Sequence, residues 1–564
     1  MDTICSLITT NVYKHIEFYT SLVYEQGEEA EYLGIKLLDE PEKFVKGAFI
    51  HTAARLYLHY DSTADSRTAN AFDKLVYSIR LLRNDVLRTW GKLNALRGAC
   101  ALFKAGKLSS LPEDCIDLLR DRTDIGDFYD REKNALRNAP SNYYQVAMAC
   151  AGYREMLGWG IDGECDRIKT KLLEIMTGFS AEGWMDEQPP FGRYDRYSIL
   201  ISSELIDSLN SLNKEIPEFA IKNLKDAVKL ALACANENGD GVIYGRSLSV
   251  HGDCAMLELL ATAFKMGLIE EKDKTVALSY CGAILRKTFN FWLDRERNSY
   301  NIWFDGRTTN NYRQVRRLLE VNLDMDIHML ATFDNMADAG CLNESVDAPL
   351  PESPYGFASP YKTVFSTGDG GERVLYSFVE KGKLYQLPLI GTGNLALNAS
   401  YQPFPATVQR IEANPESHHP FLVPHFTAED GKKYVPSGFY HEITDESVTV
   451  NGTKGTRITA KGNTSLFTEG AKLPAESNIP FTAVYTFAGN KITLEYTAHT
   501  NEKLRCRVLY AYGENGCGVT FNGVSPEAQN VEGDPAYFTP HGGITEVREY
   551  EASDNTLTVQ LDLI

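Results

Sequence analysis

Long runs with apolar residues at three- and four-residue spacing dominate residues 1–340, and this spacing restricts the first part of the chain to helices. The runs are Lys43–Tyr60, Ala71–Phe103, Tyr143–Leu157, Asp166–Phe179, Tyr197–Leu212, Ile221–Asn236, Val250–Met266 and Thr275–Leu293. Polar or glycine-containing connectors separate these runs, as expected between helices. We therefore expect residues 1–340 to form a succession of helices.

The helices repeat as pairs with a period of about 50 residues, which is typical of repeat architectures. Three pairs are Tyr143–Phe179, Tyr197–Asn236 and Val250–Leu293, and a loop with glycine plus an acid or aromatic residue follows each. Antiparallel pairs whose loops recur at the same end predict an incomplete (α/α)6 helical toroid. Its loops would line a cleft at one rim.

The pattern changes over residues 341–360, where proline, serine and glycine accumulate as at a domain boundary. Short runs of alternating polar and apolar residues follow, and hairpin-turn signals occur at Asn451–Gly455 and Ala488–Lys491. We predict an α+β fold: a toroid over residues 1–340, a linker over 341–360 and an antiparallel β-sandwich over 361–564.

Composition excludes several classes of function. With 564 residues the chain is too long for one core. A net charge of −19 argues against binding to nucleic acid or to an anionic membrane surface. No G-x-G-x-x-G, phosphate-loop, H-E-x-x-H or G-x-S-x-G motif is present, so we expect no cofactor. The partner we expect is an oligosaccharide substrate, and a homo-oligomer remains open.

The N-terminal stretch Met1–Leu22 lacks the charged, apolar and small-residue regions of a secretory signal, and no apolar run could span a bilayer. The 11 cysteines are scattered singly, several within apolar helical runs. Buried free thiols in a reducing compartment are the expected state. We therefore expect a cytoplasmic protein.

The stretch Ala181–Ser198 is the strongest candidate for a functional site. Glycines and a proline pair make it a long loop between two predicted helices, where binding groups usually lie. Its candidate residues are Trp184, Asp186, Glu187, Arg193, Asp195, Arg196 and Tyr197. Aromatic rings can stack on a sugar, and charged groups can bind its hydroxyls or carboxylate. The alternative is a polar loop that pairs its own charges.

Other candidates lie near the starts of further predicted helices: Asn142, Tyr143, Asp240, Tyr244, Arg246, His251 and Arg307. Ordinary alternatives exist for each group, namely a helix N-cap at Ser141 or Asn142, an Arg246–Asp253 ion pair, and a solvated charged turn around Arg307. The histidines of the segment His418–His425 suggest a metal, but no acid stands at a usual ligand spacing, so we expect no metal site.

These residues resemble the bacterial family known as domain of unknown function 2264, which includes the β-glucuronidases of glycoside hydrolase family 154. Four motifs carry the resemblance: Asn142–Tyr143, Gly183–Trp184 with Asp186, Tyr194–Tyr197, and Gly245–His251. The resemblance spans roughly residues 130–330 and implies a helical toroid, a C-terminal sandwich and an exo-acting enzyme on uronic-acid-containing glycans. The family's Tyr and Arg after the Gly-Arg-Ser-Leu motif are Val250 and His251 here. Arg196 or Arg193 would then have to bind the substrate carboxylate. A looser likeness to heparinase and alginate-lyase toroids rests on Asn142 and Tyr197.

Three functions follow. Glycoside hydrolysis needs two carboxyl groups, for which Asp186 and Asp195 are first choice and Glu187 and Asp240 the reserves. In that reading Arg246 and Tyr197 bind the sugar. β-Elimination from a uronic acid instead uses Asn142 to neutralise the carboxylate and Tyr197 as the base, assisted by His251 or Tyr143. A non-catalytic glycan-binding protein is the third. The sequence favours hydrolysis, with elimination as the runner-up.

Overall fold

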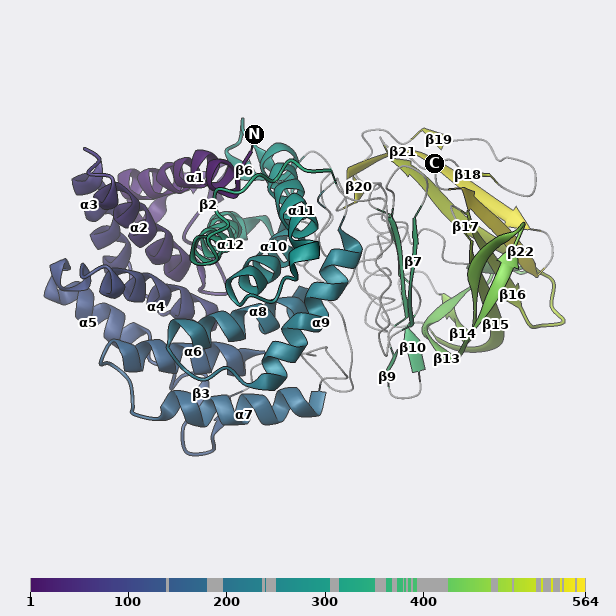
Figure 1. Ribbon diagram of the computed structural model, residues 1–564, viewed down its shortest axis with the longest axis horizontal. Coiled ribbons are helices and arrows are strands. Elements are labelled where there is room, and N and C mark those ends of the chain that lie inside the picture. The colour runs from purple at the N-terminus through teal and green to yellow at the C-terminus, as the bar shows by residue number, and fades with distance from the viewer. Residues whose placement is uncertain are drawn as a thin grey trace.

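The computed structural model separates into a helical part and a sheet part, which occupy the two halves of Figure 1. The residues that the structure describes are 2–137, 142–179, 196–235, 239, 250–304, 314–349, 362–367, 373–378, 380–381, 384–386, 389–392, 425–467, 475–488, 491–513, 519–520, 529–530, 538–539, 542–552 and 555–562. Everything below concerns these residues.

Six inner helices form a ring in the helical part (Figure 1). They are α2 (Val45–Ser62), α4 (Thr89–Lys104), α6 (Tyr143–Met156), α8 (Arg196–Ser211), α10 (Val250–Lys265) and α12 (Leu318–Asp338). Each packs against the next in this order, and α12 packs against α2, so the ring closes. The helical toroid expected from the sequence is confirmed.

Six further helices lie outside the ring. They are α1 (Ile4–Gln26), α3 (Thr68–Arg80), α5 (Glu113–Arg122), α7 (Glu164–Phe179), α9 (Glu218–Cys234) and α11 (Lys274–Lys287), the last continued by a short π-helix over Thr288–Trp292. The pairs α6 and α7, α8 and α9, and α10 and α11 each pack together. Short two-stranded hairpins connect an outer helix to the next inner helix at three places: β1 (Glu31–Tyr32) with β2 (Ile35–Lys36), β3 (Tyr129–Asp130) with β4 (Ala135–Leu136), and β5 (Leu293–Asp294) with β6 (Ser299–Tyr300).

Lysine ion pairs link the C-terminal ends of the inner helices, and this end of the ring is called the lysine rim below. Lys265 at the end of α10 lies 3.0 Å from Asp207 of α8 and 3.2 Å from Asp338 of α12. Lys214, just after α8, lies 3.4 Å from Glu155 of α6. Lys107, just after α4, lies 2.8 Å from Asp61 of α2. Lys104 at the end of α4 also donates to the carbonyl of Ser211 at the end of α8. All six inner helices therefore run in one direction, and their N-terminal ends share the opposite end of the ring, called the mouth below.

The helix expected over Ala71–Phe103 is two helices, because α3 ends at Arg80 and α4 begins at Thr89. Leu81, Leu82 and Leu87 in the connection are almost fully buried, so the apolar spacing continues through the reversal and hides it. The carbonyl of Leu81 accepts a hydrogen bond from Lys46 Nζ, which satisfies one of the open acceptors at the end of α3.

Glycines allow α2 and α4 to cross at close range. A Cβ added to Gly47 of α2 would lie 1.9 Å from the carbonyl oxygen of Gly91 in α4. A Cβ on Gly98 of α4 would lie 3.0 Å from Cα of His51 in α2. A larger residue at Gly47 would force the two backbones apart. The close crossing brings His51 next to Arg97, the residue before Gly98.

The C-terminal part is antiparallel throughout its described pairs, in a 13-stranded sheet and a 3-stranded sheet. The strands are β7 (Lys362–Thr367), β8 (Arg373–Phe378), β9 (Glu380–Lys381), β10 (Leu384–Gln386), β11 (Leu389–Thr392), β12 (His425–Ala428), β13 (Lys433–Val450), β14 (Thr453–Phe467), β15 (Ala475–Ala488), β16 (Lys491–Ala498), β17 (Leu504–Gly513), β18 (Val519–Thr520), β19 (Gln529–Asn530), β20 (Phe538–Thr539), β21 (Gly542–Ala552) and β22 (Thr556–Asp562).

The hairpin turn predicted at Asn451–Gly455 is confirmed. Val450 pairs with Thr453, and Asn451 and Gly452 between them both have positive φ, 51° and 84°, as a type I′ turn requires. In β15 and β16, Ala488 pairs with Lys491, which leaves a two-residue connection at the second predicted turn. The domain boundary remains a prediction: α12 ends at Asp338, β7 begins at Lys362, and residues 350–361 lie outside the described part.

Candidate functional site

Three successive inner helices begin with residues singled out in the sequence. Asn142 directly precedes α6, Arg196 and Tyr197 are the first two residues of α8, and His251 is the second residue of α10. Because the inner helices run in one direction, these positions all lie at the mouth. The remaining candidates lie outside the described residues: Trp184, Asp186, Glu187, Arg193, Asp195, Asp240, Tyr244, Arg246 and Arg307.

Asn142 is the best-defined polar group at the mouth. Its backbone is helical, and its side chain makes no N-cap hydrogen bond, so it does not serve the capping role that sequence alone allows. The residue is 7% exposed, and Oδ1 has no hydrogen-bond partner in the part of the chain that the structure describes. A buried amide oxygen without a partner is costly, and such groups point to a missing ligand or water.

His251 and Tyr143, two further candidates at these helix starts, differ in burial. His251 is fully buried, and Tyr143 packs half-buried against the apolar core. Asp253, two residues after His251, accepts a hydrogen bond of 2.8 Å from Trp292 Nε1 and lies 3.1 Å from Lys287 Nζ. Asp253 therefore faces the end of the outer helix α11 and the π-helix that follows it.

Ion pairs occupy the other half of the mouth, where α12, α2 and α4 begin. The buried carboxylate of Glu40 accepts hydrogen bonds from the backbone N–H groups of Phe44 and Val45 and so caps α2. Arg317 makes two hydrogen bonds to Glu320, at 3.0 and 2.8 Å, and lies 3.9 Å from Glu40. The starts of α2 and α12 are thus neutralised by the protein, whereas the start of α6 leaves Asn142 Oδ1 without a partner among the described residues.

A layer of buried polar side chains lies inside the ring, and sequence reasoning missed it. Glu204 of α8 accepts hydrogen bonds from Arg97 Nη2 of α4 at 3.1 Å and from Gln145 Nε2 of α6 at 3.4 Å. His328 Nδ1 of α12 lies 2.5 Å from Glu258 Oε2 of α10. Each of these five inner helices therefore contributes one polar group, and they are called the axial layer below.

Electrostatics couples the members of the axial layer. Burial raises the pKa of Glu204, and the Glu258 charge raises it further, while Arg97 and His328 oppose the shift. The sequence holds a signal that could have located the layer. Tyr197 and Glu204, like His251 and Glu258, are seven residues apart and so share a helix face, and each glutamate interrupts an apolar run.

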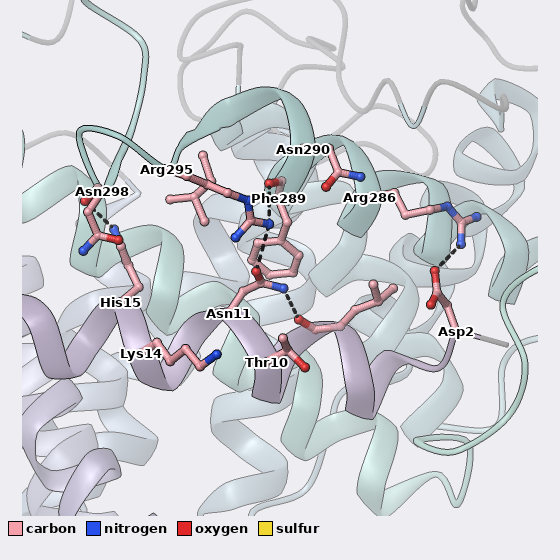
Figure 2. A pocket seen from close by; sticks show the side chains of 12 residues that line it. Asp2, Thr10, Asn11, Lys14, His15, Arg286, Phe289, Asn290, Arg295 and Asn298 are labelled. Atoms are coloured by element: carbon pink, nitrogen blue, oxygen red, sulfur yellow. Dashed lines mark hydrogen bonds and ion pairs between the residues drawn. The ribbon is translucent and has the colours of Figure 1, made fainter.

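A cavity of about 460 Å³ lies outside the ring, between α1 and the segment from α11 to β6 (Figure 2). Arg286 at one end is paired with Asp2 and Asp347, and Arg295 donates to Asn11 Oδ1 and to the Phe289 carbonyl. His15 at the other end lies 2.8 Å from Asp326, whose pKa burial raises. No residue singled out in the sequence lines this cavity.

The nine cysteines that the structure describes with their side chains are free thiols, and all but Cys5 are buried, as the sequence predicts. Among the described residues no three histidine, cysteine, aspartate or glutamate side chains gather as a metal site would need. Within the same residues no helix combines the length and apolar character needed to cross a bilayer.

No family model and no curated protein sequence matches the chain. The resemblance to the glycoside hydrolase family therefore has no support from family models. Among solved structures, the chain resembles polysaccharide lyases at low identity. The chondroitin AC lyase of Streptomyces coelicolor A3 in complex with chondroitin sulphate has a TM-score of 0.49 at 9% identity, over 99% of this chain and 79% of that one. A mutant of the same lyase has a TM-score of 0.48 at 10% identity, over 99% and 79%. The heparan sulfate lyase HepC from Pedobacter heparinus has a TM-score of 0.42 at 10% identity, over 92% and 75%. The resemblance concerns the path of the backbone alone. The sequence identities are too low to assign the reaction of these enzymes to this chain.

Proposed function

We propose that this protein is a carbohydrate-active enzyme that cleaves a uronic-acid-containing glycan by β-elimination at the mouth of the ring. One observation carries the proposal: the amide oxygen of the buried Asn142 has no partner among the described residues, and Tyr197 and His251 stand at the starts of the next two inner helices. An amide, a phenol and an imidazole on three adjacent helices are the groups that elimination requires.

The chemistry assigns a role to each group. In a uronic acid the hydrogen at C5 is weakly acidic, and hydrogen bonds to the carboxylate stabilise the charge that develops when it leaves. The Asn142 amide, which can present either its oxygen or its NH2 group, bonds the carboxyl. Tyr197 must start as its phenolate: it takes the C5 proton and becomes the neutral phenol, while the C4–O bond breaks and C4=C5 forms. The leaving oxygen receives a proton from Tyr197 or His251, so that charge and atoms balance.

The mouth offers a physical reason for elimination ahead of hydrolysis. Hydrolysis would rest on the carboxyl pair Asp186 and Asp195, which lies outside the described residues. Carboxylates described at the mouth are already engaged: Glu40 caps α2, Glu320 is paired with Arg317, and Asp253 lies 3.1 Å from Lys287 Nζ. The open hydrogen-bonding capacity at the described mouth belongs to an amide, which suits recognition of a carboxyl group.

The experiment compares two products from one incubation. Purified protein is mixed with a panel of uronic-acid-containing oligosaccharides, and near-ultraviolet absorbance and reducing sugar are followed together. Elimination gives both signals, because the 4,5-unsaturated uronate absorbs. Reducing sugar without absorbance would replace the proposal with hydrolysis. Affinity for a glycan with neither signal would replace it with a binding protein.

A further inference from the structure

Arg97 crosses the interior of the ring. It stands on α4, and its partner Glu204 stands on α8, with α6 between these helices in the ring order. Gln145 of α6 donates to the same Glu204 oxygen from the side. The guanidinium is therefore held inside the ring by Glu204, whose carboxylate is in turn fixed by Gln145 of a third helix.

The Arg97 side chain has more donors than the protein uses. A guanidinium carries five N–H donors, and in the described part of the chain Arg97 makes one hydrogen bond, to Glu204. Its side chain is 16% exposed, so the remaining donors are not sealed against apolar groups. A guanidinium held in a largely buried site is costly unless acceptors surround it. The described part of the chain therefore leaves Arg97 with donors for a partner that carries acceptor oxygens.

His51 of α2 supplies a second, independent sign of a missing partner. The residue is 7% exposed, and Nδ1 has no hydrogen-bond partner among the described residues. Burial lowers the pKa of His51 well below its usual value, and the charges of Arg55 and Arg97 lower it further. A neutral imidazole has one donor and one acceptor nitrogen, so it can bond a hydroxyl or an oxyanion beside Arg97.

We propose that Arg97 and His51 form an oxyanion-binding floor below the mouth and hold a carboxylate or sulfate of the substrate. The proposal rests on the proposed function for its substrate class and extends it to a second anionic group. Glu204 and Glu258 lie seven residues beyond Tyr197 and His251, a helical rise of about 10 Å. The bound oxyanion therefore belongs to a sugar unit deeper in the ring than the one that is cut.

The charges around Arg97 allow a bound anion when the carboxyl group of Glu204 is protonated. Glu204 and Glu258 face Arg97 from α8 and α10, and His328 pairs with Glu258. An anion beside Glu204 is tolerated when that carboxyl carries a proton, which its burial favours. Arg97 can then turn its free edge to the ligand and form the paired hydrogen bonds typical of guanidinium and oxyanions.

The test is equilibrium binding of monosaccharides that the enzyme cannot cut. Calorimetry compares glucuronate, glucose 6-sulfate and glucose on the full-length protein. We expect the anionic sugars to bind at least about tenfold more tightly than glucose, as charge-assisted hydrogen bonds allow. Tight binding of glucuronate or of the sulfate identifies which oxyanion the site takes. No preference for either anionic sugar would overturn the proposal.

Variants of Arg97 test whether the preference for anionic sugars comes from the oxyanion-binding floor. Arg97→Lys keeps the charge and loses the paired geometry, so it should remove most of the preference. Lys104→Met, on the same helix at the lysine rim, should leave it intact. If Arg97→Lys fails to fold, the paired change Arg97→Met with Glu204→Gln removes both buried charges together. A folded Arg97 variant that retains the full preference would overturn the proposal. Because no turnover is measured, an Arg97-dependent preference stands even if elimination is never observed.

Discussion

The two ends of the inner ring use polar side chains in opposite ways. At the lysine rim, Lys265, Lys214 and Lys107 each meet a carboxylate of a neighbouring helix. At the mouth, the start of α6 carries the buried Asn142 amide, whose oxygen has no partner in the part of the chain that the structure describes. Polar groups that satisfy one another stabilise a fold, whereas a buried group left open costs stability and is available to a ligand. The comparison predicts that mutations at the rim affect stability and that mutations at Asn142 affect turnover.

The largest expected effect is at Asn142. Asn142→Ala should lower the rate of unsaturated product formation by about 100-fold or more, the usual loss when one donor to a developing oxyanion is removed. Its midpoint of thermal unfolding should change little, because Oδ1 has no partner to lose within the described residues. Asn70→Ala, on the exposed face of α3, is the matched control. A large loss of stability with unchanged turnover would make Asn142 a structural residue like those of the rim.

Lys265 gives the opposite expectation. Lys265→Met leaves Asp207 of α8 and Asp338 of α12 without their shared cation. Removing one partner of a partly buried pair should lower the free energy of unfolding by about 2–4 kcal/mol. Denaturant unfolding measures this loss, and Lys272→Met, in an exposed pair with Glu270, should cost far less. Loss of turnover in a protein that remains folded would break the contrast between the two ends.

The sequence predicts the ring better than the site, for a physical reason. Helical spacing in runs such as Val250–Met266 reports which face is buried, and that information is local. Inside the ring, the partners of Arg97 and Glu258 come from helices that are far apart in the sequence. No local sequence pattern predicts which helices face each other. The reversal after Arg80 was hidden for a related reason, because buried leucines continue through it. Asn142 could be picked out from its place at a helix start, but its unpaired oxygen could not.

A smaller effect is expected from the half of the mouth that the protein neutralises itself. Glu40→Ala removes the acceptor for the backbone N–H groups at the start of α2. Loss of such a cap should lower the free energy of unfolding by about 1–2 kcal/mol, with turnover unchanged. Glu42→Ala, two residues away and exposed, is the control for denaturant unfolding. A fall in turnover without a fall in stability would extend the candidate site around the whole mouth.

The smallest expected effect is a change in the pH dependence of stability at the lysine rim. At the rim, a hydrogen bond from Lys214 lowers the pKa of Asp166. A carboxyl group whose pKa is lower in the folded state stabilises the fold at pH values above its unfolded pKa of about 3.9. This contribution disappears as pH falls through the pKa of the folded state. The unfolding midpoint of the protein should therefore exceed that of Lys214→Met at neutral pH, and the difference should shrink on acidification below about pH 4. Lys222→Met, which removes an exposed pair with Asp226 on α9, should leave the pH dependence of Asp166 in place. A difference that grows as pH falls would mean that Lys214 does not stabilise the rim through Asp166.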